Sequence, residues 1–176
     1  MKSRKKHQPV KLIIGLIFKD NSVYSRAKAF LVRKFGRVDF ESQTLDFTYT
    51  DYYEKEFGKG LKRAFISFKK LILPQQLAAI KTITNSLETR LSRNGSRRIN
   101  IDPGYLELSK LVLATTKDYS HRIYLGKGIY AEVTLFYRRN TFCPWEWTYP
   151  DYRTEAYLKI FNRIRQIYIE QSGKLP

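Results

Sequence analysis

The chain of 176 residues carries 33 Lys and Arg against 16 Asp and Glu, which gives a formal net charge of +17. Apolar residues make up 43% of the sequence and aromatic residues 15%, so a disordered chain is excluded and one domain with a hydrophobic core is expected. One cysteine, Cys143, and two histidines exclude an internal disulfide and a zinc site of four nitrogen and sulfur ligands.

The first nine residues are basic and polar, which predicts a flexible arm ahead of a single α+β domain over residues 10–176. The apolar run that follows, Val10–Phe18, is interrupted by Lys11, and no small-residue cleavage site comes after it. No apolar stretch reaches the roughly 20 residues that a membrane span requires. We therefore expect a cytoplasmic protein without a membrane segment.

The first hundred residues begin with a strand and a helix. Val10–Phe18 is nearly all apolar, as in a strand that is covered on both faces. Asn21 or Ser22 is predicted to cap a helix whose apolar positions follow helical spacing and which ends at Gly36.

Two strands, a helix and a short strand are predicted next. Phe40–Tyr49 and Lys62–Leu73 are rich in the residue types that strands favour. Pro74 suits the first turn of a helix. Arg98–Ile101 predicts a short strand that ends at Asp102-Pro103-Gly104, a sequence typical of a turn. The order strand, helix, strand, strand, helix, strand is that of a ferredoxin-like βαββαβ core.

The rest of the chain predicts added strands and a closing helix. Leu111–Thr115, His121–Leu125 and Ile129–Tyr137 are β-rich, and the sequence "GKG" between the last two favours a tight hairpin turn. A helix capped by Asp151 or Thr154 follows an aromatic loop. The fold class is therefore α+β, with antiparallel C-terminal hairpin strands and a closing C-terminal helix added to the core.

Catalytic signatures are weak. The turn after the first strand lacks the glycines of a phosphate loop or a dinucleotide fingerprint, and no G-x-S-x-G motif occurs. The sequence identifies no cofactor, and whether the protein is an enzyme stays open.

The candidate catalytic residues are His121, Asp102 and Glu132. The predicted hairpin places Glu132 across from Ile123 or Arg122. This register predicts either a structural Arg122–Glu132 ion pair or a His121–Glu132 pair suited to acid–base chemistry. Asp102 would then orient the histidine, or it simply forms the turn, and Glu132 otherwise faces water.

Hydroxyl and basic side chains are the candidates for binding a ligand. Clustered tyrosines either pack a domain edge or supply hydroxyl groups to an anion pocket. The predicted ligand-binding residues are Tyr49, Tyr52, Tyr53, Thr115, Thr116, Lys117 and Arg122. The carboxylates of Asp46, Asp51 and Glu54 are the alternative for holding Mg²⁺, although no metal site is assigned.

The aromatic loop over residues 142–152 has two interpretations. It either forms a stacking platform for nucleobases or completes the core.

Three segments carry a resemblance to a known family. They are "LDFTYTDYYEKEFG", "NIDPGYLELSKLVLATTKDYSHRIYLGKGIYAEVTLFY" and "PDYRTEAYLKIFNRIRQIY". The chain resembles the prokaryotic domain-of-unknown-function family 4416 over almost its whole length except the basic arm. The resemblance implies a bacterial or archaeal cytoplasmic protein and assigns no activity.

Three functions remain open from the sequence. The first is a domain that binds a phosphate-bearing ligand, a nucleotide or RNA, near the Tyr49–Tyr53 loop and residues 115–132, because a strongly basic protein attracts polyanions. The second is a small enzyme that acts on a phosphorylated or nucleotide-like substrate, with His121 as acid or base. The third is a protein-interaction module without chemistry.

Overall fold

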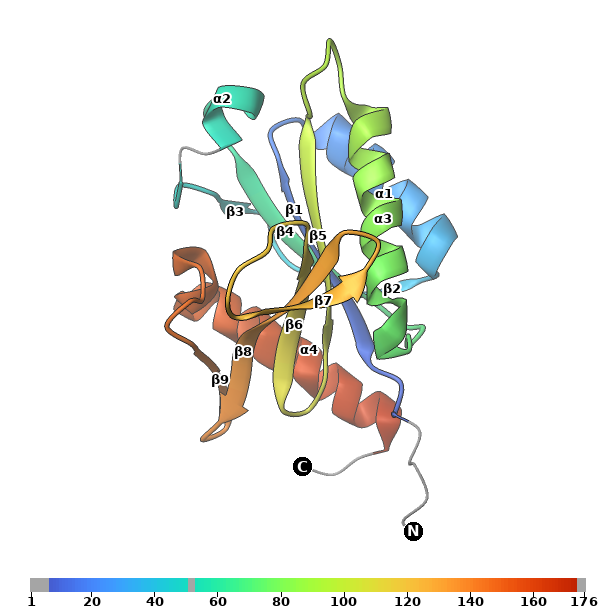
Figure 1. Cartoon of the computed structure of the whole chain (residues 1–176), viewed down its shortest axis with the longest axis vertical. Coiled ribbons are helices and arrows are strands. Elements are labelled where there is room, and N and C mark those ends of the chain that lie inside the picture. Colours follow the sequence, from blue (N-terminus) through green and yellow to red (C-terminus); the bar gives the residue numbers. More distant parts are fainter. Residues whose placement is uncertain (1–6, 51–52, 174–176) are drawn as a thin grey trace.

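The computed structural model describes residues 7–50 and 53–173, and it is a mixed α/β structure built around one large sheet. All strand pairs of this sheet are antiparallel, and nine strands belong to it within the described residues. Helices α1 (Asn21–Phe35) and α3 (Leu77–Leu91) cover one face, and α4 (Glu155–Ser172) covers part of the other (Figure 1).

The strands are connected by helices as well as by loops, since α1 lies between β1 and β2 and α3 lies between β4 and β5. Their bounds are β1 Lys11–Phe18, β2 Val38–Glu41, β3 Leu45–Asp46, β4 Lys62–Phe68, β5 Ile99–Leu106, β6 Lys110–Thr115, β7 Arg122–Gly126, β8 Ile129–Arg138 and β9 Thr141–Pro144. The order across the sheet is β2-β4-β1-β5-β6-β8-β7, with β3 paired to β4 and β9 paired to β8. Three short helical segments complete the fold: α2 Glu54–Phe57 and the 3₁₀ turns Pro74–Gln76 and Pro150–Arg153.

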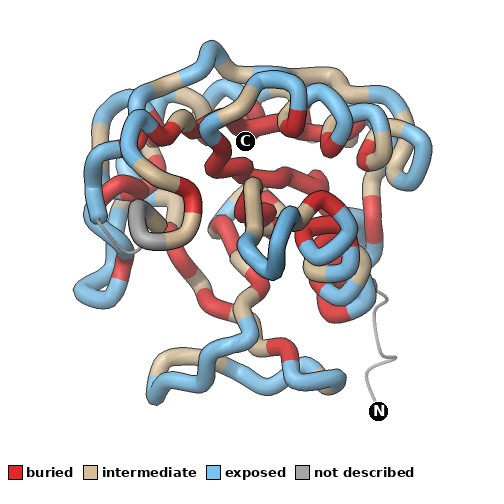
Figure 2. The backbone as a smooth tube through the Cα atoms, turned by 90° about the horizontal axis from the view of Figure 1, so that it is seen from above, coloured by how far each residue is buried: buried red, intermediate tan, exposed pale blue. Residues whose placement is uncertain are grey.

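Two hydrophobic clusters lie on opposite faces of the sheet. One joins β1, β4 and β5 to α1 and α3 through residues such as Leu16, Leu31 and Leu87. The other packs Phe161 and Tyr168 of α4 on the opposite face, against residues of β1, β4 and β8. Buried residues follow the strands between these helices, as Figure 2 shows in red. Since every residue of β1 is buried, the prediction of a doubly covered central strand is confirmed.

Helix boundaries differ slightly from the predicted ones. The cap of α1 is Asp20 and neither Asn21 nor Ser22, because Asp20 Oδ1 accepts a hydrogen bond from the Ser22 amide at 2.7 Å. Thr154 caps α4, as one of the two predicted residues. The predicted strand Phe40–Tyr49 is broken into β2 and β3. The Ser42 amide still donates to the Phe65 carbonyl at 2.9 Å, but the Phe65 amide donates to the Ser42 hydroxyl in place of a backbone carbonyl.

The prediction of a turn at Asp102-Pro103-Gly104 is wrong. β5 runs through all three residues, which pair with Gly15, Ile14 and Ile13 of β1. Gly104 is needed there because a Cβ would lie 2.3 Å from the Val112 carbonyl oxygen of β6. The close approach of β6 therefore explains the glycine, and Asp102 becomes a residue in the middle of a strand.

The hairpin of β7 and β8 is confirmed, with Arg122 paired to Glu132. Gly126, Lys127 and Gly128 all have positive φ, which a tight turn of this kind requires. This hairpin projects from the layered body of the molecule, and most of its residues are exposed or half-buried (Figure 2).

The prediction that Glu132 faces water is wrong, because its side chain is only 3% exposed. Side chains do not alternate strictly between the two faces along β8. A register shift in its pairing with β6 places Leu135 in the cluster that contains α4, whereas Val133 packs against the cluster that contains Leu77 of α3.

Within the part of the chain that the structure describes, none of the helices has both the length and the apolar character that crossing a bilayer demands.

Candidate functional site

The site lies where two neighbouring strands part. β5 and β6 pair only between Gly104–Leu106 and Leu111–Leu113. N-terminal to Gly104, backbone groups on the free edge of β5 find hydrogen-bond partners on α3. Lys81 Nζ donates to the Ile101 carbonyl at 2.9 Å, and the Ile101 amide donates to Glu88 at 2.5 Å. Polar side chains thus replace a neighbouring strand, and they leave an open space between β5 and β6.

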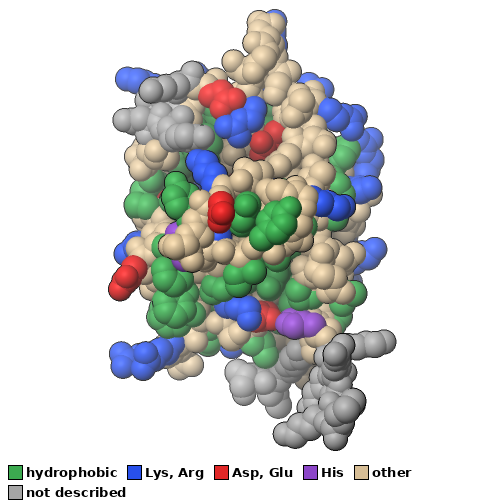
Figure 3. All heavy atoms as spheres, in the orientation of Figure 1, with side chains coloured by type: hydrophobic (Ala, Val, Ile, Leu, Met, Phe, Trp, Pro, Cys, Tyr) green, Lys and Arg blue, Asp and Glu red, His purple; other side chains and the backbone are tan. Residues whose placement is uncertain are grey.

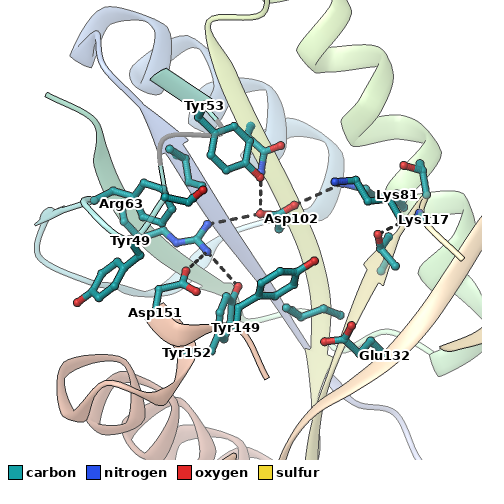
Figure 4. A pocket seen from close by; sticks show the side chains of 18 of the residues that line it. Tyr49, Tyr53, Arg63, Lys81, Asp102, Lys117, Glu132, Tyr149, Asp151 and Tyr152 are labelled. Atoms are coloured by element: carbon teal, nitrogen blue, oxygen red, sulfur yellow. Dashed lines mark hydrogen bonds and ion pairs between the residues drawn. The ribbon is translucent and has the colours of Figure 1, made fainter. Parts of the chain in front are cut away.

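This space is a cavity of about 580 Å³. Figure 4 shows side chains of several elements pointing into it. Its charged lining residues are Arg63, Lys81, Glu88, Arg97, Asp102, Lys117, Arg122, Glu132 and Asp151. A volume of this size falls within the usual range of small-molecule sites, roughly 300–1,000 Å³.

Arg63 of β4 is the buried centre of one wall. Its side chain is 2% exposed and contacts Asp151 at 3.2 Å and Asp102 at 3.5 Å (Figure 4). Its guanidinium also donates to the Tyr152 hydroxyl at 3.3 Å. Burial opposes the charge of Arg63, but the nearby Tyr152, Tyr157 and carboxylate groups raise its pKa well above the ordinary value. Arg63 therefore stays a cation inside the protein.

Aromatic rings fix the position of this guanidinium. Its central carbon lies 5.0 Å from the ring centroid of Phe65 and 5.3 Å from that of Tyr152. The absence of a side chain at Gly15 of β1 makes space for the guanidinium. A Cβ at this position would lie 3.2 Å from Arg63 Nη1 and 3.0 Å from a Phe65 ring carbon.

Asp102 lies at the floor of the cavity and is 26% exposed. Asn100 Nδ2 donates to its carboxylate at 2.7 Å, and Lys81 Nζ lies 3.6 Å from the other oxygen (Figure 4). The carboxylate is held by groups from β4, β5 and α3, yet part of it remains open to the cavity. It can therefore accept hydrogen bonds from a bound molecule.

Two further acidic groups are buried around this floor. Burial raises the pKa of Glu88, although Lys81 opposes the rise, and burial likewise raises the pKa of Asp151 against the effect of Arg63. Glu88 also lies 3.3 Å from Arg97, which is paired with Glu56 at 2.7 Å. Buried carboxyl groups with raised pKa values are typical of functional sites, and also of structural ion-pair networks.

The opposite wall comes from β6, β7 and β8. Thr115, Thr116 and Lys117 line the cavity at the end of β6. Arg122 reaches across from β7 to Glu132 at 2.8 Å, and its guanidinium donates to the Lys117 carbonyl at 3.0 Å. Burial opposes ionisation of Arg122, but Glu132 and Tyr149 outweigh it and raise the pKa of Arg122.

A stack of aromatic rings connects the hairpin to the loop before α4. His121 is stacked between Trp147, at a centroid distance of 5.1 Å, and Tyr119, at 6.0 Å. Trp147 stacks in turn on Trp145 at 5.2 Å. The loop carries Tyr149, whose hydroxyl accepts from Arg122 at 3.2 Å and whose side chain lines the cavity.

The structure brings most of the predicted site residues together. Those that line the cavity are Tyr49, Tyr53, Asp102, Thr115, Thr116, Lys117, Arg122 and Glu132. His121 lies outside this lining, but its Nε2 is 3.1 Å from Glu132 Oε2. Both predicted contacts of Glu132, with Arg122 and with His121, are present. Tyr52 lies outside the described residues, as does Asp51 of the magnesium alternative.

The sequence interpretation missed Arg63, Lys81, Glu88, Arg97 and Asp151. A signal for Arg63 was present, because it is a charged residue inside the apolar strand sequence "KRAFISF". No such signal marks Lys81 and Glu88, which occupy helical positions that are equally typical of a solvated face. Their role follows from the parting of β5 and β6, which the sequence does not reveal.

A metal ion needs several ligand groups close together. Among the side chains that the structure describes, no three of His, Cys, Asp or Glu lie together as ligands. Asp46 of the magnesium alternative is exposed on β3, paired in the sheet with Lys62 of β4.

Comparison with known proteins identifies a family. No curated protein matches the chain. No solved structure matches it either. The family model described as Domain of unknown function (DUF4416) matches residues 8–168, which is nearly the whole sequence. The chain therefore belongs to the DUF4416 family.

Proposed function

We propose that the protein binds a small phosphate-bearing ligand, such as a nucleotide, in the cavity between β5 and β6. The observation that carries the proposal is the group formed by Thr115, Thr116 and Lys117, which line the cavity at the end of β6 next to Arg122. Basic side chains that meet in a partly enclosed space bind phosphate oxygens through charge-assisted hydrogen bonds.

The mouth of the cavity is the best place for the phosphate. Thr116 and Lys117 are exposed there. The Arg122 side chain is only 3% exposed and lies behind them, where Glu132, the Lys117 carbonyl and the Tyr149 hydroxyl hold its guanidinium, so it supports the loop that presents Lys117. Hydroxyl groups and cations side by side are typical of phosphate sites. Arg63 is unsuited to this task because two carboxylates already surround it.

The floor suits the other end of such a ligand. Asp102 and Asn100 offer acceptors, and Tyr49 and Tyr53 supply ring surface at the wall. Carboxylate and amide groups recognise hydroxyl or amino donors, whereas tyrosine rings pack against flat groups. A ligand with a phosphate at one end and donors on a flat or polyol portion at the other would complement the whole cavity.

Calorimetric titration tests the proposal. The panel is inorganic phosphate, ribose 5-phosphate, the nucleoside mono-, di- and triphosphates, and the nucleosides without phosphate. At least one phosphate compound should bind and its dephosphorylated form should bind much more weakly. Lys117→Gln should weaken binding about tenfold or more, because one charge-assisted hydrogen bond is worth about 1.5–3 kcal/mol.

Lys127→Gln is the matched control. Lys127 lies in the turn between β7 and β8, outside the cavity lining, and the substitution removes the same charge. Equal affinities of the two variants would contradict the assignment of the phosphate to the cavity mouth. Absence of binding by every phosphate compound would end the proposal.

A small enzyme is the second candidate, and the contact of Glu132 with His121 favours it. Because His121 does not line the cavity, it would act by orienting Glu132 rather than by touching the substrate. The open carboxylate of Asp102 is then the better candidate for acid or base. Incubation of the protein with any ligand found by titration, followed by mass spectrometry, would detect turnover.

The finer description of the fold is also a proposal. We infer a ferredoxin-like core for the first part of the chain, supported by the order β2-β4-β1-β5 and by the helices α1 and α3 between its strands. A cytoplasmic location is supported by the single cysteine, Cys143, which is a free thiol.

A further inference from the structure

One edge of the molecule carries a cluster of basic side chains that the cavity does not use. We call it the basic edge. It consists of Arg33 and Lys34 in the last turn of α1, Arg37 directly before β2, and Lys69 and Lys70 directly after β4. All five are exposed. Lys and Arg side chains gather along the side of the molecule that carries α1, at the right of the view in Figure 3.

Backbone contacts bring these residues together although they come from two parts of the chain. The Lys69 amide donates to the Arg37 carbonyl at 2.8 Å, next to the pairing of Val38 with Phe68. A Cβ on Gly36, which follows α1, would lie 3.8 Å from Lys70 Cβ. The two segments therefore present one continuous surface.

The charges of the basic edge are not neutralised within the molecule. Among residues 7–50 and 53–173, no ion pair involves any of the five. The acidic residues of β2 are engaged elsewhere, because Asp39 binds Lys11 and Ser67 and Glu41 binds Lys28 and Tyr24. The acidic residues of β2 therefore do not neutralise the edge in the part of the chain that the structure describes.

The fold itself explains only part of this cluster. Basic residues in the last turn of a helix are favoured by the helix dipole, which accounts for Arg33 and Lys34. It does not account for Arg37, Lys69 and Lys70, which lie outside the helix. Like charges placed side by side repel one another, so their accumulation indicates an anionic partner.

The neighbouring surface indicates which polyanion fits. The exposed aromatic side chains lie elsewhere, on the loop after β3, around β7 and between β9 and α4. Single-stranded nucleic acids are bound by aromatic rings that stack on bases, and membranes by apolar side chains that insert. Leu73, which is 39% exposed, follows Lys70 by three residues and is the one large apolar side chain with this exposure near the edge among the described residues. The five basic side chains suit the phosphate backbone of a duplex, which needs no base contacts.

We propose that the basic edge binds double-stranded nucleic acid through its phosphate backbone, independently of the cavity. Neutralisation of about five phosphates predicts a slope near −4.5 in a plot of log affinity against log salt concentration for DNA. Raising the salt from about 50 to about 200 mM should then weaken binding about 500-fold.

Fluorescence anisotropy with a labelled 20-base-pair DNA duplex of mixed sequence, and with an RNA duplex of the same sequence, tests the proposal on the full chain. The variant is Lys69→Gln with Lys70→Gln. Loss of two phosphate contacts should reduce the slope by about 1.8 and weaken binding about 60-fold at about 0.1 M salt. Binding of only one of the two duplexes would identify the helical form that is recognised.

The matched control is Arg138→Gln with Arg139→Gln, at the end of β8 and in the turn that follows it. Both residues are exposed, and no ion pair involves them in the described part of the chain. It removes the same charge, so the overall field changes equally. Equal weakening by both variants would overturn the proposal and leave only a nonspecific effect of net charge. Absence of duplex binding, or binding only to vesicles of phosphatidylcholine and phosphatidylserine, would overturn it as well.

Discussion

Replacing Arg63 with methionine should strongly destabilise the protein. Its side chain is 2% exposed and is the counter-charge of Asp151, which is 8% exposed, and of Asp102. Methionine retains much of the contact with the surrounding rings but leaves both carboxylates without their guanidinium. Breaking a buried pair in this way typically costs about 3–5 kcal/mol, and we expect a loss of that order in the free energy of unfolding.

The loss should depend on pH in a defined direction. Burial already raises the pKa of Asp151, and Arg63 counteracts this rise, so the pKa rises further in Arg63→Met. A carboxyl group whose pKa is raised on folding binds more protons in the native state than in the unfolded state. Its contribution to stability is therefore present at low pH and is lost as the pH rises through the native pKa. The difference between variant and wild type should shrink from about pH 8 to about pH 5.

Urea denaturation monitored by circular dichroism at both pH values gives the free energies. Adding Asp151→Asn to Arg63→Met should restore part of the stability, because it removes the unpaired charge. Lys159→Met is the control, since its ion pair with Glu155 is 74% and 81% exposed and its loss should have no measurable effect. A loss below about 1 kcal/mol for Arg63→Met, or no recovery in the double variant, would refute the reasoning.

Three further predictions concern single elements. Gly104→Ala should lower the free energy of unfolding, measured by urea denaturation, by about 3 kcal/mol, because its Cβ would lie 2.3 Å from the Val112 carbonyl oxygen. A change near zero would contradict the close approach of β5 and β6. Burial raises the pKa of Glu88, so ionisation of this residue lowers the stability of the native state as the pH rises. Glu88→Gln should therefore reduce the fall of the melting temperature with rising pH, while glutamine keeps an acceptor for the Ile101 amide. An unchanged pH profile would show that Glu88 does not titrate differently on folding. Thr154→Ala should cost about 1 kcal/mol in urea denaturation, because it removes the cap of α4. Thr89→Ala, at an exposed position in the last turn of α3, should cost less, and equal effects would argue against capping.

The predicted helices and the hairpin follow from local signals in the sequence. The apolar spacing after Asp20 and the cap at Thr154 locate α1 and α4, and the "GKG" turn fixes the register that pairs Arg122 with Glu132. These features depend on residues that are close together in the chain, which is why a sequence pattern can predict them.

The floor of the cavity was not predictable in the same way. Asp102-Pro103-Gly104 has the composition of a turn, but β1 and β6 hold it as a strand because Gly104 allows β6 to come close. Lys81 and Glu88 serve the free edge of β5 only because β6 departs from it. Such long-range pairing outweighs local preference.

The most direct test of the central proposal is a crystal structure of the protein with the phosphate compound that titration finds to bind most tightly. The phosphate should lie beside Thr116 and Lys117, with the rest of the molecule directed toward Asp102. A ligand bound on another surface, while the cavity between β5 and β6 holds only water, would contradict the proposal.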